Sequence, residues 1–217
     1  MRERLWAAGI AGAVVVVVVV VLALGWARPP RTSVISTDRL GPEAGEPVAD
    51  YLAAARRSLS GTDSGEHWAL VSFTAAIAPD RIPDHAGGLR IAQVLHHVSI
   101  DRVYTPTVTI PVPAGAEAAV ASARAAAALL TATQPPDERS ARIAAVSAAR
   151  LRAGCACTVG LVVRGRLPQL RELSARTDIR AVEALPADAG VYAVVPLLPE
   201  YTEVAAPGPD DGAVPQN

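Results

Sequence analysis

The chain has 217 residues and a formal net charge of −1 at pH 7, with 20 basic residues against 21 acidic ones. This balance excludes the global positive field by which nucleic-acid-binding proteins attract phosphates. Aromatic residues make up only 4% of the chain, which argues against stacking platforms for bases or sugars. Nucleic acid is therefore not an expected partner.

The first predicted element is a transmembrane helix at residues 5–26 (LWAAGIAGAVVVVVVVVLALGW), a segment without charge or proline. About 20 apolar residues suffice to cross the hydrocarbon core of a bilayer. Trp6 and Trp26 flank the segment, where amphipathic rings favour the headgroup level. A cleaved signal peptide usually has a shorter apolar region and a small-residue cleavage site, which residues 25–30 (GWARPP) do not provide. We therefore expect a retained membrane anchor, with the lipid bilayer as its partner.

The sidedness of this anchor rests on a weaker pattern. Arg2 and Arg4 precede the apolar segment and Arg28 and Arg31 follow it, so the positive-inside rule hardly separates the two orientations. A short basic N-terminus followed by a large exported domain is the commoner arrangement. The predicted location is thus the cell membrane, single-pass, with the body of the chain outside the cytoplasm.

The body alternates between helical periodicity and extended, β-branched patterns. In chain order it predicts a helix at 47–59, a strand at 67–74, a short helix within 79–88, a strand at 89–98, an edge strand or extended arm at 103–112, helices at 116–131 and 137–153, a strand at 158–164, a helix at 167–175, and strands at 179–185 and 191–198. Pro106 and Pro111 place the segment 103–112 at a sheet edge, since proline cannot donate to a sheet ladder.

Two stretches, 69–98 and 158–185, share the order strand, short helix, strand. Such spacing implies parallel pairing or a split βαβ arrangement. The expected fold class is α/β (α+β): an N-terminal transmembrane helix followed by a ferredoxin-like sandwich of two strand–helix–strand units with an inserted helix pair.

The expected organisation divides the chain into five parts. They are a cytoplasmic stub at 1–4, the transmembrane helix at 5–26, a linker at 27–36, an extracytoplasmic α/β domain at 37–200 and a disordered acidic tail at 201–217. The tail is expected to be disordered because it has three prolines, an acidic pair and no basic residue.

Cys155 and Cys157 are the only cysteines and form the disulfide or redox candidate of the sequence. Outside the cytoplasm they can oxidise, and a bond across one residue is a candidate for thiol–disulfide exchange. However, Cα atoms two residues apart in an extended segment lie about 6.5–7 Å apart, near the limit for a disulfide. Redox enzymes also usually place Cys-x-x-Cys at a helix N-terminus. A static bridge or two buried small side chains is the preferred interpretation.

His96 and His97 could join the two cysteines as zinc ligands. Adjacent strand residues point to opposite faces, however, so the two histidines rarely reach one ion. One solvent-facing and one core-facing histidine is the favoured interpretation. Met1 is the only methionine, which argues against a copper site built from thioethers. The sequence predicts no metal site and no cofactor.

The chain carries no nucleophile elbow, zincin helix or phosphate loop. Asp63, Glu66 and His67 cluster before a strand and are the group considered for acid–base catalysis. A polar linker has the same composition, so no catalytic residue is predicted and a non-enzymatic function is favoured.

All the basic residues are arginine, and four of them lie along the predicted helix at 137–153: Arg139, Arg142, Arg150 and Arg152. The abundance of arginine is typical of a GC-rich genome, so a solvated helix face explains the four. Binding to an anionic envelope polymer or to lipid headgroups is the alternative.

The run RAGCACTVGLVVRG at 152–165, followed by LPQLRELSARTDIRAVEALP at 167–186, looks like uncharacterised single-span membrane proteins of high-GC Gram-positive bacteria. This resemblance brings no known activity. The predicted function is a single-pass membrane-anchored protein whose extracytoplasmic domain binds another envelope or membrane protein. The alternative is a thiol–disulfide active envelope protein that uses Cys155 and Cys157.

Overall fold

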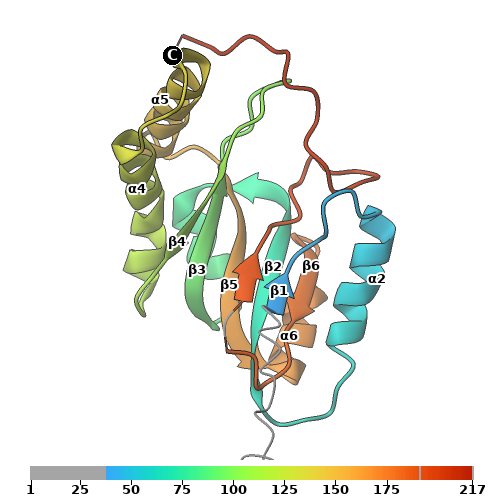
Figure 1. Cartoon of the computed structure of the whole chain (residues 1–217). Helices are drawn as coiled ribbons and strands as arrows, with labels where there is room; N and C mark the ends of the chain where they lie inside the picture. Colours follow the sequence, from blue (N-terminus) through green and yellow to red (C-terminus); the bar gives the residue numbers. More distant parts are fainter. Residues whose placement is uncertain (1–37, 191, 217) are drawn as a thin grey trace, which may run out of the picture. The chain divides into compact units, whose positions relative to one another are not determined.

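A computed structural model describes residues 38–190 and 192–216 of the chain (Figure 1). All of them belong to the second of two compact units, Thr37–Asn217. The predicted stub, transmembrane helix and linker at 1–36 lie outside the described residues. Within the described residues, no helix is both long enough and apolar enough to cross a bilayer.

Five strands form an antiparallel sheet in the order β4-β3-β5-β2-β6. The strands are β2 (Glu66–Ile77), β3 (Arg90–His97), β4 (Thr107–Pro111), β5 (Thr158–Arg166) and β6 (Ile179–Ala184). Every neighbouring pair is antiparallel. The described domain is therefore of mixed α+β class, and β4 is an edge strand, as Pro106 before it and Pro111 within it predict.

Each predicted strand–helix–strand stretch is present, and the two interlock. β2 and β3 flank η1 (Pro79–Arg81) and α3 (Ile82–His85), while β5 and β6 flank α6 (Leu167–Ser174). β5 lies between β2 and β3, and β2 lies between β5 and β6. Of the two pairings that the spacing allows, the split arrangement is the one observed. Two further helices, α4 (Ala116–Ala132) and α5 (Glu138–Arg152), come between β4 and β5.

One face of the sheet packs against helices. Val71 and Phe73 of β2 point toward this face and are completely buried. α6 covers them with leucines that recur every three residues, at 167, 170 and 173. Burying each such leucine contributes about 1.5–3 kcal/mol relative to leaving it exposed. This face of the sheet therefore forms a closely packed apolar core with the helices.

The other face is covered by shorter elements. β1 (Asp38–Leu40) and β7 (Tyr192–Val194) form a parallel pair that lies in front of the sheet in Figure 1. Leu40 packs there against Leu70 of β2 and Val162 of β5. The helix α2 (Val48–Ser58) lies beside β6, with Tyr51 in the same apolar cluster as Ala181 of β6. The strand predicted at 191–198 is shorter than expected, since Pro196 interrupts it and the chain continues as irregular structure.

Parts of the tail that is expected to be disordered have defined contacts, between Tyr201 and Val214. Ala205 is buried and joined to Gly45 by backbone hydrogen bonding. Asp210 and Asp211 each form an ion pair with an arginine of the domain. The composition of the tail is polar and rich in proline, but its acidic pair finds a basic surface on the same chain, which the local sequence does not reveal.

Candidate functional site

The two adjacent histidines of β3 point to opposite faces of the sheet, as the alternation of strand residues predicts. His96 faces α4 and is 1% exposed, with its Nε2 2.9 Å from the Ser122 hydroxyl. His97 faces the other way and is 8% exposed, with its Nε2 2.9 Å from Oε1 of Glu200. The expectation that one histidine faces solvent is wrong, because Glu200 and the chain around it cover His97.

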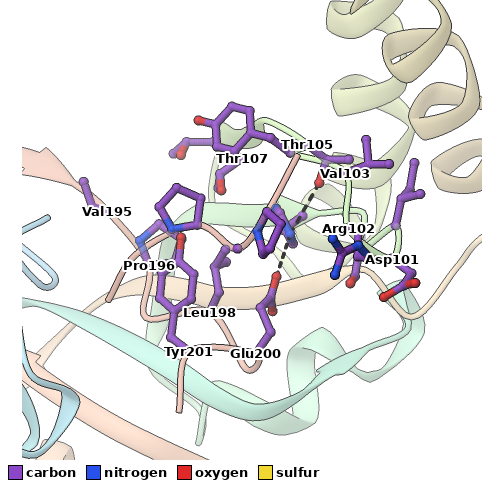
Figure 2. Close-up of a pocket in the computed structure, with 18 of the residues that line it drawn as sticks. Asp101, Arg102, Val103, Thr105, Thr107, Val195, Pro196, Leu198, Glu200 and Tyr201 are labelled. Atoms are coloured by element: carbon purple, nitrogen blue, oxygen red, sulfur yellow. Dashed lines mark hydrogen bonds and ion pairs between the residues drawn. The ribbon is translucent and has the colours of Figure 1, made fainter. Parts of the chain in front are cut away.

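A cavity of about 480 Å³ opens beside His97 on this second face (Figure 2). We call it the groove. It is bounded by four parts of the chain: the loop 99–105 after β3, Thr107 and Thr109 of β4, the segment 194–201 that begins in β7, and residues 207–209 of the tail. The edge strand β4 therefore supplies one wall of the groove, and the C-terminal tail supplies another.

Exposed apolar side chains gather at the groove. Tyr104 is 58% exposed and Val195 is 39% exposed, and both line it. Pro196 and Tyr201 also line it, on the side opposite Thr107 in Figure 2. Large apolar side chains on the surface of a soluble domain mark interaction sites when they lie together around a cavity.

The base of the groove is held in place by the contact between the buried His97 and the partly exposed Glu200. Burial is the largest single influence and raises the pKa of the Glu200 carboxyl, but the hydrogen bond from His97, a backbone hydrogen bond and the nearby charges of His97 and Arg180 together hold that pKa below its usual value. The Nδ1 atom of His97 is buried and has no hydrogen-bond partner in the described part of the chain. Thr105 lies nearby and donates its hydroxyl to the Val98 carbonyl at 2.7 Å.

Arg180 of β6 fixes the segment that carries Glu200. Its guanidinium donates to the carbonyls of Leu198 at 2.8 Å and Pro199 at 3.3 Å, and also to the Tyr201 carbonyl. Burial lowers the pKa of this guanidinium below its usual value. The segment 198–201 therefore crosses the face of the sheet. It is attached to β6 through Arg180 and to β3 through His97.

The tail wall of the groove is joined to the domain by its acidic pair. Asp211 pairs with Arg102 in the loop 99–105, and Asp210 pairs with Arg139 of α5 at 2.8 Å. The backbone N–H of Tyr104 also donates to Asp210 at 3.0 Å. This contact is not predicted from the sequence, in which the one usable signal is the coincidence of an acidic tail with an arginine-lined helix.

The four arginines of α5 are thus only partly a solvated face. Arg139 binds the tail, Arg150 donates to the Ser99 carbonyl in the groove loop at 3.2 Å, and Arg142 pairs with Glu138 at 2.9 Å. Arg152 donates to the hydroxyl of Thr131 on α4. Two of the four therefore position elements of the groove.

The two cysteines lie away from the groove lining. The Cys155 and Cys157 sulfur atoms are bonded to each other, with Cα atoms 5.3 Å apart. This separation is below that of an extended chain because residues 155–157 bend between α5 and β5. The Cys157 carbonyl accepts a hydrogen bond from the His97 backbone N–H at 2.8 Å. The bridge is therefore adjacent to the strand end that carries His97.

The considered acid–base group converges only in part. His67 Nε2 lies 2.9 Å from Asp63 and its Nδ1 lies 2.7 Å from the Leu185 carbonyl. The hydrogen bond from His67 lowers the pKa of Asp63. Glu66 instead pairs with Arg164 at 3.2 Å. None of the three considered side chains lines the groove, and the arrangement ties a loop to the end of β2.

The zinc set considered from sequence is not assembled. His96 is hydrogen-bonded to two hydroxyls, those of Ser122 and Thr158, and both cysteines are in the disulfide. Among the described residues, no three His, Cys, Asp or Glu side chains lie close enough to hold a metal ion.

The chain matches no protein-family model, no curated protein and no solved structure. The geometry of the groove is therefore the guide to function. A strand edge, the exposed Tyr104 and Val195 side chains and the His97–Glu200 pair at the base make a surface that can receive an extended peptide segment.

Proposed function

We propose that this protein is a single-pass membrane protein whose extracytoplasmic domain binds a segment of another envelope or membrane protein in the groove. The observation that carries the proposal is the position of the groove beside β4, which among the described residues has a sheet neighbour only on its β3 side. A partner in extended conformation can use such an edge for backbone hydrogen bonds and place its side chains in the adjacent cavity. Tyr104 and Val195 then contribute the apolar contact area.

We further propose that the domain is a ferredoxin-like sandwich. Without β4, the strand order β6-β2-β5-β3 and the two interlocked strand–helix–strand units support this topology. In this description β4 is an added edge strand, and α4 and α5 are an inserted helix pair. In this proposal the added strand β4 has a functional role, because it supplies one wall of the groove.

The anchor and its orientation are proposed from the sequence of residues 5–26 and their flanks. A reporter enzyme that is active only outside the cytoplasm, fused after Asn217, tests the orientation. We expect activity. A reporter that works only in the cytoplasm would place the groove inside the cell and remove an envelope partner from consideration.

Blocking the groove tests the binding function. We expect that Thr109→Arg, which puts a long charged side chain into the groove, removes a protein that co-purifies with the full chain from detergent-solubilised membranes. Thr177→Arg is the matched control, since Thr177 is exposed in the turn before β6 and lies outside the groove lining. Equal recovery of the same partner with both variants would contradict the proposal.

The second candidate is a thiol–disulfide function, favoured by the bond between Cys155 and Cys157. It requires an external dithiol that reduces the bridge and releases two protein thiols. Titration of free thiols on the folded full chain separates the two functions. Under the binding function we expect a bridge that mild dithiols leave intact, and reversible opening of the bridge would favour the redox function instead.

A further inference from the structure

One wall of the groove is built by residues 207–209, which begin an acidic segment of the chain itself, residues 207–212 (PGPDDG). We propose that the partner of the groove presents an acidic extended segment, and that residues 207–212 are an internal competitor for the same arginines. This inference rests on the proposed function and adds to it the chemistry of the partner and the way in which access is controlled.

The first argument is charge complementarity. The two aspartates of the segment bind two arginines that belong to different elements, Arg102 in the loop after β3 and Arg139 on α5. Arg139 also donates to the carbonyl of Gly212 at 3.1 Å. The basic surface thus recognises both carboxylates and backbone of an extended acidic segment, which is the chemistry a competing partner must offer.

The second argument is the close backbone contact at Gly212. Its N–H donates to the Arg102 carbonyl at 2.6 Å, and a Cβ atom at this position would lie 2.4 Å from the Asp101 carbonyl oxygen. Arg102 itself has a φ of 53°, the one positive value for a non-glycine residue in the described part of the chain. The loop is therefore shaped around the tail and not merely touched by it.

The third argument is that a partner can replace the tail in its two ion pairs with Arg102 and Arg139. The paired side chains remain 41–62% exposed, so water and salt compete with both ion pairs. Exposed ion pairs of this kind are weak one by one. The tail keeps its place because it is tethered, which gives it a high effective concentration at the arginines. A partner with more contacts in the groove can displace it.

Displacement would leave a basic surface next to the groove. Arg102 and Arg139 would lose their carboxylates, and Arg150 lies close by through its bond to the Ser99 carbonyl. Two acidic side chains line the cavity, Glu200 and Asp101. The Glu200 carboxylate is already paired with His97. The opened site is therefore complementary to a negatively charged segment.

A peptide with the sequence of residues 204–216 (VAAPGPDDGAVPQ), labelled and supplied in trans, tests the competition by fluorescence anisotropy on the full chain in detergent. We expect Asp210→Asn/Asp211→Asn to bind this peptide about tenfold or more tightly than the wild type, because the internal segment no longer competes. Asp50→Asn/Glu172→Gln removes the same charge from exposed positions on α2 and α6 and should bind like the wild type.

Two further arms establish the chemistry. Adding Arg139→Gln to the Asn variant should abolish the gain, and binding should weaken strongly between about 0.1 M and about 1 M salt, where the Debye length falls from about 10 Å to about 3 Å. Equal affinity of the wild type and the Asn variant, no binding to either, or equal binding of a peptide with both aspartates replaced by asparagine would overturn the inference.

Failure of this inference is distinguishable from failure of the proposed function. If Thr109→Arg removes the native partner while the peptide results show no competition, the groove binds a partner that is not acidic. If Thr109→Arg has no effect on the partner, the groove itself is not the binding site.

Discussion

His96 and His97 are neighbours on β3, yet the two faces of the sheet give them opposite surroundings. His96 lies under α4 between two hydroxyls, and burial lowers its pKa to about 4. His97 lies at the base of the groove, paired with a carboxylate. The Ser122 hydroxyl donates to the Ala119 carbonyl, so it accepts from His96 Nε2–H, and the imidazole is neutral.

This comparison extends from the histidines to the faces that carry them. The helix-covered face is apolar and closely packed, while the other face is covered by two short strands and by segments held through ion pairs. Both faces carry buried apolar side chains, but the proposed binding site lies on the second face alone. Perturbing each face should accordingly change different observables.

The largest effect is expected from the packed face. Leu170→Ala removes a completely buried side chain of α6 and should lower the free energy of unfolding by about 2–5 kcal/mol. Thr109→Ala, in the groove, should change it by less than about 0.5 kcal/mol. Denaturant titration of the full chain in detergent measures both. Similar losses for the two variants would remove the distinction between the faces.

The next effect concerns His96 and acid. Because its pKa is lower in the folded chain than the ordinary value of 6.5, the unfolded state binds the extra proton. His96 stabilises the fold above about pH 6.5, and this contribution of about 3 kcal/mol is lost as the pH falls toward 4. His96→Gln should flatten the dependence of unfolding free energy on pH in this window. An unchanged slope would show that His96 is not the group responsible.

A smaller effect is expected at the base of the groove. Glu200→Gln keeps the shape of the side chain but removes the charge that pairs with His97. Because Glu200 is half-exposed, we expect a loss of only about 1 kcal/mol in unfolding free energy. The amount of partner that co-purifies with the variant should fall by more than this small loss of stability explains. If stability falls while partner recovery is unchanged, the ion pair serves the fold alone.

The smallest effect on stability is expected at the tail. Asp210→Asn/Asp211→Asn should shift the midpoint of thermal unfolding little, since exposed ion pairs contribute about 0–1 kcal/mol each. Hydrogen exchange at the backbone N–H of Gly212 should nevertheless become faster, because its bond to Arg102 depends on the tail staying in place. Unchanged exchange would indicate that backbone contacts hold the tail without the carboxylates.

Much of the fold follows from local patterns, and the groove does not. The helices α2, α4, α5 and α6 begin and end within about two residues of their predicted bounds, because apolar periodicity and capping residues such as Asp137 act locally. The opposite directions of His96 and His97 follow from strand alternation. The partners of His97 come from position 200, and those of Asp210 from position 139. Such contacts between distant residues leave no periodic signal in the sequence.

Site-specific photo-cross-linking in native membranes tests the central claim most directly. A photoreactive phenylalanine analogue in place of Tyr104 puts the reactive group at the mouth of the groove, and the same analogue in place of Leu129, 50% exposed on α4, is the control. We predict a discrete adduct with one envelope or membrane protein from position 104 that Thr109→Arg abolishes, and none from position 129. Adducts of the same kind from both positions, or none from position 104, would contradict the assignment of the groove as the binding site.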